Sequence, residues 1–94
     1  MHAPLSNFSY TAFDPHQVLK SMGKDKAIEL LSNMVKIRYF ETFAETSYLE
    51  GLVAGFFHSY IGQEAIQVGA VGAIGKDQGH WITTYRCHAL ALLT

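Results

Sequence analysis

A histidine and a tyrosine–arginine pair are the side chains of this sequence best suited to chemistry. His58 stands in a glycine-containing loop, where its imidazole could hydrogen-bond a substrate oxygen or transfer a proton near neutral pH. Tyr85 and Arg86 directly follow a predicted strand, and ligands of open α/β sheets bind at the carboxyl ends of strands. A guanidinium there suits a phosphate or carboxylate. A structural loop histidine and a surface arginine paired with a carboxylate are the alternatives.

Other reactive side chains give weaker indications. His80 and His88 flank the same predicted strand, but zinc needs three or four ligands, and the spacing supplies no such set. Cys87 is the single cysteine, which excludes an intrachain disulfide, favours a reducing compartment and is more typical of a small buried thiol than of a nucleophile. Glu64 begins a predicted helix, where a carboxylate interacts favourably with the helix dipole, so we expect a cap or supporting residue.

Composition limits the classes of protein and partner. The 94 residues are 49% hydrophobic and only 16% charged, which allows one domain at most and predicts that a partner or further chain covers part of its surface. A net charge of −1 argues against nucleic acid and anionic membranes as partners. The longest apolar run, Ala89 to Leu93, is far too short to cross a bilayer. The first twenty residues resemble neither a signal nor a transit peptide, so the sequence predicts a cytoplasmic, bacterial-type location.

The first half of the chain predicts an arm followed by two helices. Residues 1–13 have no periodicity and are expected to form an extended arm. Asp14 before Pro15 is typical of a helix start, and the helix should end near Met22. A second helix should begin at a cap on Asp25 and end near Glu50.

The second helix carries two apolar faces. One face is formed by seven residues, Ala27, Ile28, Leu30, Leu31, Met34, Val35 and Ile37, and the roughly opposite face by Tyr39, Phe40, Phe43 and Ala44. We therefore expect two different surfaces to meet this helix. Arg38 and Glu41 are three positions apart and could pair across one turn.

The second half of the chain predicts a loop, a helix over Gln63–Ile74, a strand over Trp81–Tyr85 and a helix that starts at His88. One face of the first of these helices has no side chain larger than methyl, which predicts close packing against another element; its residues are Ala65, Gly69, Gly72 and Ala73. The order of elements favours an α/β domain that is beginning a parallel sheet. Because the apolar pattern continues to Thr94 without a cap, we expect a segment of a longer chain.

Three blocks of this sequence resemble the alpha subunit of the thiamine diphosphate-dependent pyruvate dehydrogenase (acetyl-transferring) component. They are M-V-x-I-R-x-F-E at 34–41, G-F-x-H-x-Y-x-G-Q-E-A at 55–65 and I-T-x-Y-R-x-H at 82–88. The resemblance implies that residues 14–94 are the amino-terminal part of the family's thiamine diphosphate-binding domain. The fold class would be α/β, with the amino-terminal helices and first strand of an incomplete parallel-sheet domain.

The resemblance also implies an activity and a site. The family decarboxylates pyruvate oxidatively with thiamine diphosphate and Mg²⁺, and transfers the acetyl group to a lipoyl carrier, which feeds acetyl-CoA formation. His58 matches the family histidine that reaches the substrate, and Tyr85 and Arg86 match the pair that contacts thiamine diphosphate. Branched-chain relatives usually lack a histidine at the position of His58, which favours pyruvate. The implied partners are a beta subunit in an α₂β₂ assembly, which supplies the cofactor-activating glutamate, and a lipoyl acyltransferase core.

The sequence departs from the family in two places. Cys87-His88-Ala89 replaces the more usual Asp or Ala followed by His-Gly, and the Gly-Asp-Gly to Asn-Asn segment that binds magnesium and diphosphate has no counterpart here. The chain alone is therefore expected to be inactive. The alternatives are an alpha subunit for acetoin or another 2-oxo acid, and a noncatalytic truncated remnant or protein-binding helical module.

Overall fold

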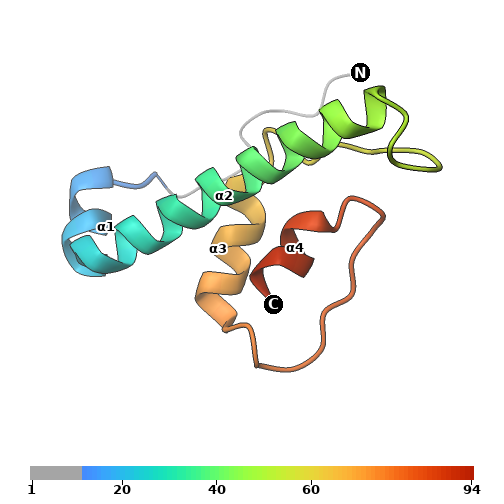
Figure 1. The fold of residues 1–94 in the computed structure, drawn as a ribbon. Coiled ribbons are helices and arrows are strands. Elements are labelled where there is room, and N and C mark those ends of the chain that lie inside the picture. Colours follow the sequence, from blue (N-terminus) through green and yellow to red (C-terminus); the bar gives the residue numbers. More distant parts are fainter. Residues whose placement is uncertain (1–11) are drawn as a thin grey trace, which may run out of the picture.

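A computed structural model describes residues 12–94 as four helices joined by two long loops. The helices are α1 (Pro15–Met22), α2 (Lys24–Leu49), α3 (Glu64–Ile74) and α4 (His88–Leu93). Figure 1 shows α2 crossing the molecule, with α1 folded back at its start and α3 and α4 packed side by side against its middle. Within this part of the chain, no helix has both the length and the apolar character needed to cross a membrane.

The start of α1 forms as its capping residues predict. Asp14 Oδ1 accepts a hydrogen bond of 3.0 Å from the His16 N–H, and Pro15 occupies the first turn of α1. Gly23, with φ of +88°, both ends α1 and precedes Lys24, the first residue of α2. The prediction that Asp25 caps α2 is therefore wrong, because Asp25 lies within the first turn of the helix.

The predicted strand at Trp81–Tyr85 is wrong. This segment has no regular secondary structure, and residues 12–94 contain no strand. A strand needs hydrogen bonds from a neighbouring strand, and β-branched and aromatic residues favour a pleated surface without being able to create one alone. The described residues therefore form a helical structure. The predicted arm over residues 1–13 lies almost wholly outside the described residues.

A small core lies where α2, α3 and α4 meet. Its buried residues are Ile37, Tyr60, Val68 and Ala89, and four partly buried side chains pack against them: Leu30, Met34, Leu92 and Leu93. Of the small-residue face predicted on α3, only Gly72 comes close to another element, since a Cβ placed on it would lie 2.9 Å from Leu30 Cδ2. The other three residues of that face, Ala65, Gly69 and Ala73, are exposed. The core thus fixes the crossing of the helices from which both loops extend.

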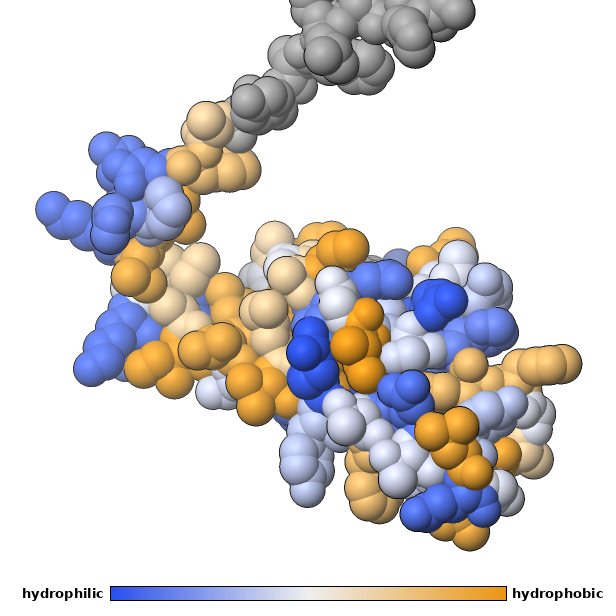
Figure 2. All heavy atoms as spheres, turned by 90° about the horizontal axis from the view of Figure 1, so that it is seen from above, coloured by the Kyte–Doolittle hydropathy of each residue, from blue (hydrophilic) through white to orange (hydrophobic). Residues whose placement is uncertain are grey.

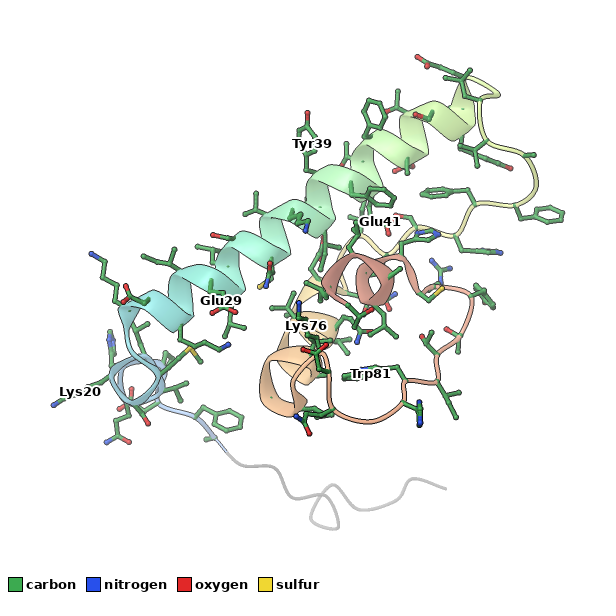
Figure 3. The ribbon with its side chains drawn as sticks, turned by 60° about the horizontal axis from the view of Figure 1, so that its bottom comes forward. Lys20, Glu29, Tyr39, Glu41, Lys76 and Trp81 are labelled. Carbon is green, nitrogen blue, oxygen red and sulfur yellow. The ribbon has the colours of Figure 1, made fainter. Side chains whose placement is uncertain are left out.

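The face of α2 opposite this core is uncovered by the described residues. Tyr39 is 75% exposed and points away from α3 and α4 in Figure 3. Ile28, Leu31, Val35 and Phe43 are also exposed, and Figure 2 shows apolar patches on the surface seen from above α2. The predicted division of α2 into two apolar faces is therefore only partly right, because Ile28, Leu31 and Val35 were assigned to the face of Ile37 and lie on the uncovered face instead.

Candidate functional site

Two loops that are distant in sequence meet beside α4. The first leaves α2 and returns along it to α3, and the second runs from α3 to the start of α4 (Figure 1). His58 on the first loop and Tyr85 on the second have ring centroids 4.4 Å apart, with the ring planes tilted by 46°. His58 is exposed and Tyr85 is 67% exposed, so both rings are open to a ligand.

Arg86 joins the same two loops. Its Nη1 donates a hydrogen bond to the backbone oxygen of Ser59, and its Cζ lies 5.9 Å from the centroid of the Tyr85 ring. None of the ion pairs formed by residues 12–94 uses this guanidinium. Because arginine has five N–H donors, it retains capacity to bind an anion.

The structure thus places the three predicted site residues, His58, Tyr85 and Arg86, next to one another. A ring nitrogen that can donate or accept a proton lies close to a cation and an aromatic face. This combination suits a ligand that carries both an anionic group and a polarisable carbonyl.

A buried carboxylate lies beneath the two loops. Glu41 has 0% exposure, its Oε1 lies 2.8 Å from His88 Nδ1, and its Oε2 accepts a hydrogen bond of 3.3 Å from the Tyr60 N–H. The predicted pairing of Glu41 with Arg38 is therefore wrong. Glu41 lies one helical turn after Ile37 on the buried face of α2, and that spacing is the sequence pattern from which its burial could have been inferred.

Arg38 binds a different carboxylate. Its Nε donates a hydrogen bond to Oε1 of Glu64, whose Oε2 accepts a hydrogen bond of 2.9 Å from the Gly62 N–H. The hydrogen bond from Arg38 lowers the pKa of the Glu64 carboxyl and raises that of the guanidinium. Burial raises the pKa of the neighbouring Tyr60 hydroxyl. Glu64 thus supports the end of the first loop, in keeping with the supporting role expected at the start of α3.

Aromatic side chains complete the wall behind the site. The His88 ring stacks on Phe57, with centroids 5.6 Å apart and ring planes 10° apart, and Phe57 stacks on Tyr48 at 5.8 Å. Phe40 meets the edge of His88 at 6.2 Å. His88 is therefore part of a packed aromatic cluster, a role that its position next to a predicted strand did not indicate.

The remaining candidates do not join the site. His80 is exposed on the second loop, and Cys87 is a free, half-buried thiol. Between residues 12 and 94, no group of three or more His, Cys, Asp or Glu side chains could hold a metal ion. An open apolar groove between α1, α2 and α3 is lined by residues such as Val18, Leu30 and Gly69, and by none of the site residues.

Comparison with known proteins identifies related sequences. The family described as "Dehydrogenase E1 component" matches residues 32–94, which is more than half of the chain. Three similar proteins are named pyruvate dehydrogenase E1 component subunit alpha. The Dictyostelium discoideum protein is 42% identical over 70 residues, covering 74% of this chain and 18% of the relative. The Chaetomium thermophilum protein is 35% identical over 91 residues, covering 95% of this chain and 22% of the relative. The Zymomonas mobilis protein is 42% identical over 65 residues, covering 69% of this chain and 18% of the relative.

The chain therefore spans about a fifth of the length of these relatives. No solved structure matches it significantly. The cytoplasmic location predicted from the sequence is contradicted, because the relatives from D. discoideum and C. thermophilum are named as mitochondrial proteins. The composition of the first twenty residues, on which that prediction was based, does not outweigh this finding.

Proposed function

Because this chain belongs to the dehydrogenase E1 component family, we propose that it forms part of the alpha subunit of a thiamine diphosphate-dependent pyruvate dehydrogenase. The reaction would be the oxidative decarboxylation of pyruvate with transfer of the acetyl group to a lipoyl carrier. The observation that carries the proposal is the contact of His58 with Tyr85, with Arg86 beside them.

Tyr85 and Arg86 would contact the cofactor. Arg86 is held at one N–H by the Ser59 carbonyl and has no carboxylate partner in the described part of the chain, which fits a guanidinium that accepts a diphosphate. Thiamine diphosphate would supply the carbanion chemistry that removes carbon dioxide from a 2-oxo acid. The Mg²⁺ that accompanies the diphosphate would take its ligands from outside the described residues, since these contain no ligand cluster.

His58 would act on the substrate. Its imidazole is exposed and lies against the Tyr85 ring, at the edge of the proposed cofactor site. From there it would donate a hydrogen bond to an oxygen of pyruvate and could transfer a proton to or from the substrate.

The remaining parts of the site would come from other segments and subunits. Residues 14–94 would be the amino-terminal part of an α/β domain whose parallel sheet is formed with other segments of the subunit. A beta subunit, in an α₂β₂ heterotetramer, and a lipoyl acyltransferase would be the protein partners. The uncovered apolar face of α2, which includes the exposed Tyr39 and Phe43, is consistent with burial in such an assembly.

A substrate profile tests this proposal. The assembled enzyme is supplied with thiamine diphosphate and Mg²⁺ and assayed with pyruvate, acetoin and a branched-chain 2-oxo acid. We expect the highest kcat/KM for pyruvate. A clear preference for acetoin or for the branched-chain acid would overturn the assignment of pyruvate, and no turnover of any of the three would overturn the catalytic function.

A further inference from the structure

Glu41 is the only carboxylate of the described chain with 0% exposure, and it holds both loops of the site. One oxygen binds the first loop through the Tyr60 N–H, and the other binds the start of α4 through His88. Figure 3 shows Glu41 on the side of α2 that faces α4. A buried carboxylate is costly unless it is well hydrogen-bonded, so its position requires both partners to be in place.

The two partners of Glu41 have the same relation to the site residues. Tyr60 lies two positions after His58, and His88 lies two positions after Arg86. The bond to the Tyr60 N–H therefore holds the backbone two residues after His58, and the bond to the His88 imidazole holds the residue two positions after Arg86. The hydrogen bond from Arg86 to Ser59 closes the same arrangement at the surface.

The aromatic cluster cannot hold the two loops in one relative position as the hydrogen bonds to Glu41 do. Stacking of Phe57 on His88 favours contact between the loops, but aromatic pairs tolerate offsets along the ring plane. Two hydrogen bonds to one buried carboxylate define a single register of the two segments.

We infer that Glu41 is a positioning residue that sets the placement of His58 relative to Tyr85 and Arg86. The effect on catalysis rests on the proposed function, whereas the effect on the loops does not. Removal of the carboxylate should release both loops while the α2–α3 packing stays intact.

Hydrogen exchange followed by mass spectrometry on the 94-residue chain tests the positioning role. We expect Glu41→Ala to raise deuterium uptake at least about tenfold in rate over 57–62 and 84–90, because the Tyr60 N–H and His88 lose their partner. Uptake in α3 should stay close to that of the wild type. Glu45→Ala, one turn further along α2 at an exposed position, is the matched control and should change neither loop.

Two conservative variants keep the test decisive. Glu41→Gln can accept from Tyr60 N–H and donate to His88 Nδ1, so we expect near-normal uptake. Glu41→Asp is one methylene too short to reach both partners and should release at least one loop, even if the alanine variant fails to fold. Wild-type uptake in both loops of the alanine and aspartate variants would overturn the inference, as would an equal rise in α3.

A kinetic measurement on the assembled enzyme separates this inference from the proposed function. We expect Glu41→Ala to lower kcat for pyruvate about tenfold or more, with partial recovery in Glu41→Gln. If the loops are released but pyruvate turnover does not change, the positioning role holds and the proposed function fails. If the loops stay protected, the positioning role fails whatever the kinetics.

Discussion

Arg38 in the middle of α2 donates a hydrogen bond to Glu64 at the first residue of α3, across 26 positions of sequence. The Glu64 side chain is only 5% exposed, and its second oxygen holds the Gly62 N–H at the end of the first loop. The pair therefore ties the first residue of α3 to the middle of α2. It also holds the end of the loop that carries His58.

This ion pair predicts a dependence of stability on acid pH. The folded-state pKa of Glu64 is lowered below its ordinary value of 4.5, first by the hydrogen bond from Arg38. The unfolded chain thus binds the proton more readily, so the stabilisation is present above about 4.5 and is lost as pH falls through the lower folded-state pKa. The free energy of unfolding in urea is measured as a function of pH. We expect both Glu64→Gln and Arg38→Gln to weaken its dependence on pH in this acid range. If both variants kept the pH dependence of the wild type, the role of this ion pair in stability would be contradicted.

The core predicts a strong contrast between two isoleucines of α2. Ile37 has 0% exposure, and Ile28 is 51% exposed on the same helix. Ile37→Ala should lower the free energy of unfolding by about 2–4 kcal/mol, because it removes buried methyl groups and leaves a cavity. Ile28→Ala should change it by less than about 1 kcal/mol. Denaturant unfolding measures both, and equal effects would show that the core does not lie where α2, α3 and α4 meet.

Two glycines of α3 predict opposite effects. A Cβ at Gly72 would lie 2.9 Å from Leu30 Cδ2, whereas a Cβ at Gly69 would meet nothing within 4 Å. Gly69→Ala should stabilise the helix by about 0.5–1 kcal/mol through helix propensity alone. Gly72→Val should destabilise by about 1–3 kcal/mol, because Leu30 must move away from the added side chain. Thermal unfolding that ranks the two variants in the reverse order would exclude the close packing of α3 on α2.

Much of the helical structure could be predicted from the sequence, because local signals determine it. Asp14 and Pro15 mark the start of α1, and glycines with positive φ mark several of the ends. Local signals could not decide whether Trp81–Tyr85 forms a strand, because a strand must form hydrogen bonds with a second strand. The partners of Arg38 and Glu41 were also beyond local reasoning, because each binds a residue of another element.

The proximity of the site residues was predictable only through the resemblance. Neither composition nor spacing shows that His58 and Tyr85 come into ring contact. That contact depends on two loops that meet beside α4 and on the buried Glu41 between them. The roles of these residues in binding cofactor and substrate remain predictions.

Replacement of Arg86 should lower the affinity for thiamine diphosphate. Replacement by Gln keeps a hydrogen-bond donor but removes the charge that would face the diphosphate, and charge-assisted hydrogen bonds contribute about 1.5–3 kcal/mol. We expect Arg86→Gln to weaken thiamine diphosphate binding in the assembled enzyme by about 10-fold to 100-fold, measured by titration calorimetry. Lys76→Gln removes an exposed cation on the same loop and is the control. Equal affinities in the two variants would exclude Arg86 from the cofactor site.

The most direct test is pyruvate turnover by His58→Ala in the assembled enzyme. His80→Ala, an exposed histidine of the second loop, serves as the matched control. We expect His58→Ala to lower kcat/KM for pyruvate by about 100-fold or more, as the loss of a positioned acid–base group does, with thiamine diphosphate affinity retained. His80→Ala should retain wild-type turnover. Wild-type turnover by a correctly folded His58→Ala enzyme would contradict the proposed site.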